Sequence, residues 1–243
     1  MTVKTITPPL MSRRFLLSAG ALAASQVALS ACTSMGPRSP RVVSSIRPEP
    51  EYASDFDYPQ IYAARVDAGY EIPAVPYREI DSRLLRQYVA DPTGEAPGTI
   101  VVDTSQHYLY LVEPGGRALR YGVGLGRDGF AWSGRAVIQW KQAWPTWTPP
   151  EEMIARQPEL AKYSADNGGM PPGLDNPLGA RALYIFQDGA DTLYRVHGSP
   201  EWWSIGKSVS SGCVRMINQD VIDLYSRVAD GSPILVTSGV GTV

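Results

Sequence analysis

The sequence predicts a mainly β fold, a sandwich or barrel-like domain with a few short helices. From Gly98 onward, short stretches rich in β-branched and aromatic residues alternate with turn-forming glycine and proline. The chain holds 23 glycines and 21 prolines, which supply these turns, and 44% of its 243 residues are hydrophobic, as in a folded chain with a buried core. Short strands with turn signals between them are typical of this class.

The strands follow from these stretches in chain order. One hairpin joins 107–112 to 117–123 through a Pro-Gly-Gly turn. A second joins 182–187 to 191–196 through an Asp-Gly-Ala turn. Further strands are predicted at 99–103, 134–142 and 234–237.

Two helices are predicted. The late one has Asn218 as its N-cap and Asp220 in its first turn, where a negative charge favours the helix dipole. Its apolar face consists of Val221, Ile222, Tyr225 and Val228. A short amphipathic helix is predicted over 80–88, because its apolar residues recur at helical spacing.

The beginning of the chain has the features of a bacterial export signal. Lys4, Arg13 and Arg14 precede an apolar run over 15–29, which is too short to span a bilayer. Residues 12–17 resemble a twin-arginine signal. The sequence Leu-Ser-Ala-Cys that ends in Cys32 resembles a lipobox, although an ordinary cleaved signal with an incidental cysteine is the alternative.

These features suggest four regions. We expect a signal peptide over 1–31 and a lipid-anchored flexible tether over 32–49, which is rich in serine, proline and arginine. We expect an N-terminal segment over 50–97 to pack on the main domain, which extends over 98–239. The protein would then lie on the periplasmic side of the cell envelope, held to a membrane through Cys32.

The charge balance argues against nucleic acid as a partner. The formal net charge is −2, and residues 1–31 contain three positive and no negative charges, so the chain without them has a charge of about −5. It has no run rich in lysine or arginine. Nor do we expect a metal or cofactor, because two histidines and one remaining cysteine lack the close spacing of a zinc site.

Cys213 is the residue that most suggests catalysis. If Cys32 is acylated, Cys213 is the only thiol of the mature chain. It follows Ser210, Ser211 and Gly212, which indicate a tight polar loop rather than a core strand with an inert cysteine. A thiol kept outside the cytoplasm is open to oxidation, and its presence therefore suggests a reactive role.

A nucleophilic thiol needs a proton partner, because only a few per cent is thiolate at neutral pH. His197 ends a predicted strand beside a glycine and is well placed to project into a site. His107, near the start of an early strand, is expected to be an ordinary surface or hairpin histidine. We therefore expect His197 to take the proton, and its imidazolium to lower the pKa of the Cys213 thiol.

The neighbours of Cys213 suggest further roles. The backbone N–H groups of Ser211, Gly212 and Cys213 are candidates for an oxyanion hole, since glycine permits the backbone shape that this requires. Arg215 is suited to bind a carboxylate through two hydrogen bonds. A structural salt bridge is the alternative for Arg215, and the sequence leaves both open.

At these residues the chain resembles the catalytic domain of the L,D-transpeptidases, the YkuD-like family. The family signature is a His-Gly pair followed, after a loop, by Ser/Thr-x-Gly-Cys-aliphatic-Arg. Here His197-Gly198 precedes Ser210-Ser211-Gly212-Cys213-Val214-Arg215, with Asn218 downstream. The resemblance extends from about Gly98 to Val236. Many members have histidine where this chain has Ser211, so that imidazole is missing while the backbone N–H remains.

The resemblance implies a function in peptidoglycan cross-linking. Cys213 would attack the third residue of a stem peptide, release D-alanine and form a thioester, which an amine acceptor then resolves. Substrate contacts are implied at Arg215, Ser210 and Gly198. Two alternatives stay open: an L,D-carboxypeptidase or endopeptidase with the same site, and a non-catalytic peptidoglycan-binding lipoprotein. The sequence indicates neither the acceptor nor a protein partner, nor whether the Trp-rich segment 132–147 binds substrate.

Overall fold

The computed structural model describes residues 56–126, 132–210 and 212–240. The predicted signal peptide, the tether with Cys32, and Ser211 lie outside these ranges. None of the helices in the described ranges is long and apolar enough to cross a membrane.

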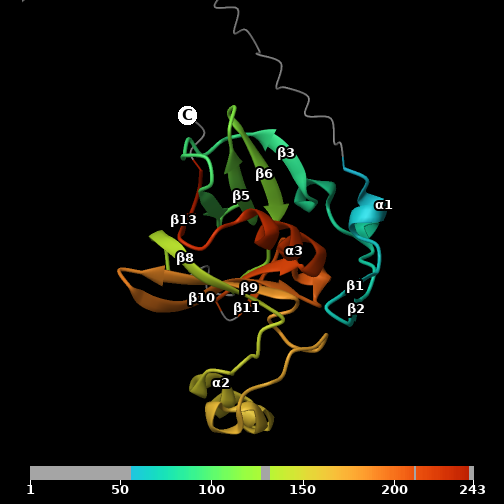
Figure 1. Ribbon diagram of the computed structural model, residues 1–243, viewed down its shortest axis with the longest axis vertical. Helices are drawn as coiled ribbons and strands as arrows, with labels where there is room; N and C mark the ends of the chain where they lie inside the picture. Colours follow the sequence, from blue (N-terminus) through green and yellow to red (C-terminus); the bar gives the residue numbers. More distant parts are fainter. Residues whose placement is uncertain (1–55, 127–131, 211, 241–243) are drawn as a thin grey trace, which may run out of the picture. The chain divides into compact units, whose positions relative to one another are not determined.

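Nine strands form one mixed sheet in the order β12-β10-β9-β8-β13-β4-β5-β6-β3, which confirms the prediction of a mainly β fold (Figure 1). Neighbouring strands are antiparallel except for the parallel pairs β10–β12 and β4–β13. The strands are β3 (Gln87–Ala90), β4 (Ile100–Asp103), β5 (Tyr108–Glu113), β6 (Arg117–Gly122), β8 (Gly134–Ala143), β9 (Arg181–Gln187), β10 (Ala190–Ser199), β12 (Val214–Ile217) and β13 (Ser232–Thr237).

Shorter elements surround this sheet. Two small strand pairs join β1 (Arg65–Asp67) to β2 (Tyr70–Ile72) and β7 (Leu125–Gly126) to β11 (Ser208–Ser210). The α-helices are α1 (Tyr58–Ile61), α2 (Glu151–Arg156) and α3 (Asn218–Arg227). The 3-10 turns are η1 (Tyr77–Glu79), η2 (Ser82–Leu84), η3 (Pro158–Tyr163), η4 (Ala165–Asn167) and η5 (Trp202–Ser204).

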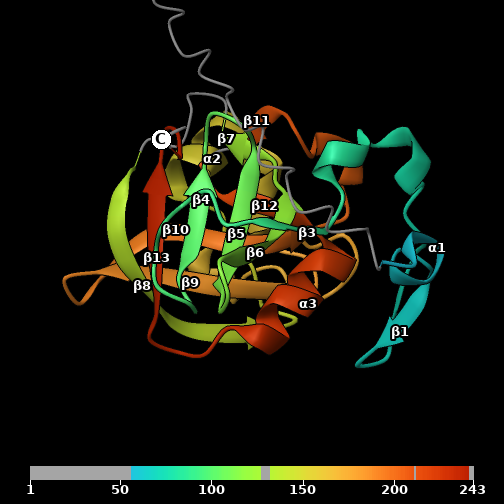
Figure 2. The ribbon, with the colours of Figure 1, turned by 90° about the horizontal axis from the view of Figure 1, so that it is seen from above.

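The large sheet curls so that one of its faces encloses a single core. Buried residues from β4, β5 and β6 pack in the same cluster as residues from β9, β10 and β12 at the other end of the sheet; among them are Ile100, Leu109, Leu183, Val196 and Met216. Figure 2 shows the cause: β8 bends around the side, and β9 and β10 cross behind β4 and β5. The strands therefore form the predicted sandwich or barrel-like arrangement, but from one continuous sheet.

The strand predictions are confirmed, with one change that matters for the site. The β5–β6 and β9–β10 hairpins are antiparallel as expected. Strand β10 continues to Ser199, beyond its predicted end at 196, so His197 lies inside the strand. Its backbone is therefore fixed by pairing with β9 and β12, and its side-chain direction follows from the strand register.

The predicted helix over 80–88 is wrong. Only Ser82–Leu84 forms a 3-10 turn, and the flanking residues Ile80 and Leu85 have extended backbone. The chain then enters β3 and pairs with the edge of β6. Helical spacing of a few apolar residues is a weak preference, and the hydrogen bonds available at a sheet edge outweigh it.

The late helix is confirmed as α3, although Asn218 does not cap it. Asn218 is the first helical residue, and its Oδ1 accepts a hydrogen bond from the backbone N–H of Ala180 at 2.9 Å. Asp220 is fully buried; Nε of Arg86 lies 3.1 Å and the hydroxyl of Tyr62 3.2 Å from its carboxylate oxygens. This cluster joins the segment before β3 to α3.

Candidate active site

The register of two parallel strands brings the predicted site residues together. His197 of β10 lies opposite Arg215 of β12. Side chains alternate between the faces of a sheet, so Arg195, His197 and Arg215 share one face, and Cys213, two residues before Arg215, belongs to the same face. The intervening residues, such as Val196, point into the core. A single register therefore places the thiol and the imidazole on the same side.

That face forms the floor of a cavity of about 620 Å³. Its floor consists of Tyr184, Leu193, Arg195, His197, Cys213 and Arg215. Residues from 146–153 together with Ala165, Pro177 and Leu178 form the remaining wall. Figure 1 shows the arrangement, with α3 on one side of β9 and β10 and α2 on the other.

The wall is a built structure that spans the segment between β8 and β9. Trp147 and Met170 exchange two backbone hydrogen bonds, at 2.9 and 2.7 Å, which join the outgoing and returning arms. The side-chain amide of Asn176, which is fully buried, donates to the carbonyl of Pro145 at 3.0 Å. The Trp-rich segment 132–147 thus contributes Trp147 to the lining of the cavity.

His197 is buried, with 4% of its surface exposed. Its Nδ1 lies 2.6 Å from the carbonyl oxygen of Gly198, and because a carbonyl only accepts, Nδ1 donates. Nε2 of the neutral ring is then the acceptor. The pKa of His197 is lowered to about 4, mainly by burial and in part by the positive charges of Arg215 and Arg195, while hydrogen bonds with the backbone of Gly198 and Pro177 oppose the shift.

Cys213 is half-buried on the same floor. Burial raises the pKa of its thiol, whereas the backbone N–H of Arg195 and the charges of Arg195 and Arg215 lower it. With the pKa of His197 at about 4, the resting pair at neutral pH is a thiol beside a neutral imidazole. The imidazolium that was expected to lower the thiol pKa stays a prediction, and the charges that lower this pKa in the structure are those of Arg195 and Arg215.

The structural salt bridge that was one of the two interpretations of Arg215 is present, and binding of a substrate carboxylate stays a prediction. Arg215 forms a salt bridge with Glu201, a half-exposed residue before η5, and it lines the cavity. Its backbone N–H and carbonyl also bond Gly124, at 2.8 and 2.9 Å. The guanidinium is therefore held by Glu201, and Arg215 lines the same cavity as Cys213.

The glycines beside the two reactive residues have distinct structural reasons. A Cβ on Gly198 would lie 2.3 Å from Oδ1 of Asn218, so strand β10 and helix α3 approach closely only because this residue has no side chain. Gly212 has a φ of +128°, which residues with a Cβ rarely adopt. Gly198 is not among the residues that line the cavity, and its contact with the site is the hydrogen bond that its carbonyl accepts from His197. Substrate contacts at Gly198 and Ser210 stay predictions.

His107 belongs to a different place. Its Nε2 lies 3.1 Å from Oγ of Ser208. It lines a separate cavity of about 280 Å³ together with Asp81, Arg83 and Tyr108. Of the two histidines, His197 is the one that shares a cavity with Cys213.

Sequence reasoning missed several residues of the cavity. Arg195 and Tyr184 are the most important, because they line the same cavity as Cys213 and lie opposite each other on the neighbouring strands β10 and β9. Arg195 could have been found, since it lies two residues before His197 in a predicted strand and so shares its face. Tyr184 and the wall residues depend on strand order and on contacts between distant segments, which a single sequence does not give.

Comparison with known proteins gives a consistent picture. Residues 97–236 match the YkuD family, the L,D-transpeptidase catalytic domain. The probable L,D-transpeptidase YbiS from Escherichia coli (strain K12) is 35% identical over 140 residues, which cover 56% of this chain and 43% of that protein. The chain thus matches less than half the length of this curated relative.

Solved structures also resemble the chain. A structure described as a probable carnitine operon oxidoreductase from Brucella melitensis is 46% identical, covers 65% of this chain and 96% of its own, and has a TM-score of 0.45. An L,D-transpeptidase from Mycobacterium smegmatis is 20% identical, covers 57% of this chain and 58% of its own, and has a TM-score of 0.41.

Proposed function

Because the chain belongs to the YkuD family of L,D-transpeptidase catalytic domains, we propose that it is a peptidoglycan L,D-transpeptidase with Cys213 as nucleophile and His197 as proton partner. One observation carries the assignment of these residues: thiol and imidazole project from neighbouring parallel segments of the sheet into one cavity. The cavity is large enough for a peptide, and its arginines suit an acidic one.

The first step starts from the neutral pair. As the sulfur of Cys213 attacks the carbonyl carbon of the third stem residue, the thiol proton passes to Nε2 of His197, which is the acceptor because Nδ1 donates to Gly198. A C–S bond forms, and the backbone N–H groups of Ser211, Gly212 and Cys213 are the proposed donors to the oxyanion. The C–N bond then breaks, and D-alanine leaves with the proton from the imidazolium.

The second step reverses the proton transfer. An acceptor amine attacks the thioester, His197 takes its proton, and the sulfur leaves and is reprotonated as a thiol. Burial favours an uncharged thiol and an uncharged ring at the start and end of the cycle. Arg195 and Arg215 stabilise the sulfur while it is negatively charged, and Arg215 and Ser210 are proposed to contact the substrate.

Hydrolysis is the second candidate function. Water in place of the amine would convert the same thioester into a trimmed stem, as in an L,D-carboxypeptidase. Incubating the purified protein with tetrapeptide muropeptides and analysing the products by mass spectrometry separates the two. Dimeric products indicate transpeptidation, tripeptides alone indicate hydrolysis, and unchanged muropeptides contradict both. Cys213→Ala is the control for product that does not depend on the thiol.

For its location we propose export by the twin-arginine route. We further propose removal of residues 1–31 and lipidation of Cys32 on the periplasmic side of the envelope. The lipobox-like residues before Cys32 and the apolar run over 15–29 support this. Cell fractionation and intact-mass measurement of wild type and Cys32→Ala test the proposal. A variant that stays in the membrane fraction with the lipidated mass of the wild type would contradict it.

A further inference from the structure

A row of side chains leads across the sheet from the thiol to the solvent. The register places Trp140 of β8 opposite Tyr184 of β9, and Tyr184 opposite Arg195 of β10. Arg195 is level with Cys213, because each lies one residue before a matched pair of β10 and β12. The row Trp140–Tyr184–Arg195–Cys213 therefore crosses β8, β9 and β10 on the cavity face and ends at the residue before β12.

The side chains of this row stack on one another. The ring centroids of Trp140 and Tyr184 are 3.5 Å apart with 11° between their planes. The guanidinium carbon of Arg195 lies 4.5 Å from the centroid of the Tyr184 ring. Tyr184 is thus held between an indole and a guanidinium, and Tyr184 and Arg195 both line the cavity.

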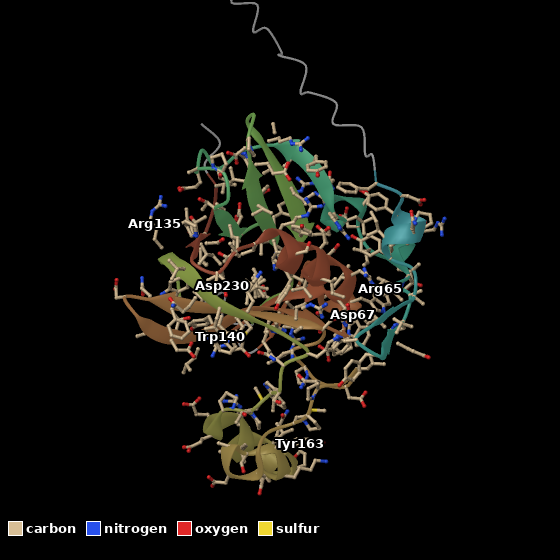
Figure 3. All side chains as sticks on the ribbon, in the orientation of Figure 1. Arg65, Asp67, Arg135, Trp140, Tyr163 and Asp230 are labelled. Atoms are coloured by element: carbon tan, nitrogen blue, oxygen red, sulfur yellow. The ribbon has the colours of Figure 1, made fainter. Side chains whose placement is uncertain are left out.

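Trp140 is the solvent end of this stack. It is 39% exposed, and the pairing of β13 with β8 reaches only Ile138, so the sheet does not flank the indole on its outer side. Figure 3 shows Trp140 on the side of β8 that faces α2, whereas Arg135 lies on the other side. An indole that its neighbours hold rigidly, with surface open beside a cavity, is suited to bind a flat apolar ligand surface.

We propose that Trp140 is a stacking platform for the sugar ring that carries the stem peptide, which deepens the proposed function and rests on it. A pyranose ring presents a face of C–H groups to an indole and keeps its hydroxyls in water. The peptide portion, which carries carboxylates, lies over Tyr184 and Arg195, where the guanidinium offers charge complementarity. The uncharged surface of Trp140 fits the sugar better than an acidic second peptide.

The distances agree with this occupant. Three strand spacings separate Cys213 from Trp140, about 14 Å. Between the attacked carbonyl and the sugar lie three residues and a lactyl linker, and three extended residues span about 10 Å. With the linker added, the sugar ring reaches the indole when the stem lies along the row.

The test compares two ligands on one inactive protein. Calorimetry with Cys213→Ala measures the Kd of a disaccharide tetrapeptide and of the same tetrapeptide without sugar. Adding Trp140→Ala should weaken binding of the disaccharide ligand about threefold to tenfold and leave binding of the bare peptide unchanged. Trp203→Ala, which removes a tryptophan that is 53% exposed and does not line the cavity, is the matched control.

Two results would overturn the inference. Equal weakening of both ligands would mean that Trp140 binds peptide, and no weakening would mean that its ring is only a structural stack. Trp140→Phe should restore most of the sugar-dependent affinity, which a general loss of folding would not allow. Because the inactive protein is used, this result does not depend on turnover: product analysis tests the transpeptidase function by itself.

Discussion

The two histidines of the chain lie at comparable places and yet have different surroundings. Each lines a cavity and has an oxygen atom within hydrogen-bonding distance of a ring nitrogen. His107 lies in a half-exposed turn with a φ of +60°, whereas His197 lies inside β10, where it is paired with β12 on one side and with β9 on the other. His197 is the candidate base because the strand register places the thiol of Cys213 on the same face of the sheet.

Substitution of Cys213 should reduce turnover more than any other change. Cys213→Ala should abolish thioester formation and turnover, because no other group on the cavity floor is a comparable nucleophile. Cys213→Ser should be nearly as inactive, since the neutral imidazole would have to activate a far less acidic hydroxyl. Intact-mass detection of the acyl-enzyme and product analysis measure both steps. Turnover that persists in Cys213→Ala would place the nucleophile elsewhere.

The second prediction compares the turnover of alanine variants of the two histidines. His197→Ala should lower turnover about 10²- to 10⁴-fold, as expected for the loss of a general base, while His107→Ala should change it by less than about twofold. The same assay with the same substrate serves both variants, and each is compared with the wild type for thermal stability. The opposite ranking of the two variants would mean that the cavity around His107 contains the reaction site.

Much of this comparison could be predicted from the sequence. The strands, the late helix and the pairing of Cys213 with His197 follow from local patterns and from a motif with fixed spacing. The lowered pKa of His197 could not, because it depends on burial, and the packing of the segment 146–178 over the sheet is not visible in the sequence. The helix predicted over 80–88 failed for a related reason, since β6 offers that segment a partner that its own residues do not reveal.

A third prediction concerns pH and stability. Burial depresses the pKa of His197 to about 4, while in the unfolded chain it is about 6.5, so between these values the unfolded state binds the extra proton. Stability linked to His197 is therefore complete above pH 6.5 and is lost as the pH falls toward 4. Between pH 7.5 and 4.5, wild type should lose about 2–3 kcal/mol more than His197→Asn, which keeps a donor for the Gly198 carbonyl.

Chemical denaturation at the two pH values measures this difference. Burial raises the pKa of Asp220 to about 6, so protonation of this carboxylate stabilises the folded state as the pH falls. This contribution is the same in both proteins and cancels in the comparison. His107→Asn is the second control. Because its ring is only half-buried, it should lose much less of the pH dependence than His197→Asn. Equal pH dependence in wild type and His197→Asn would show that the ring titrates normally.

The last prediction concerns the arginines whose charges lower the pKa of the Cys213 thiol. Arg195→Met removes a charge that lowers the pKa of the Cys213 thiol and leaves the backbone N–H in position. The thiol pKa should rise, and only modestly, because Asp191, 2.7 Å away, already neutralises much of the guanidinium charge. The rate of iodoacetamide alkylation as a function of pH measures the thiol pKa.

Arg135→Met, which removes an exposed arginine on the other side of β8, should leave the alkylation profile unchanged. His197→Ala should also shift it little, since the resting ring carries no charge at neutral pH. A rise of more than one pH unit in His197→Ala, with none in Arg195→Met, would show instead that the resting pair is a thiolate and an imidazolium.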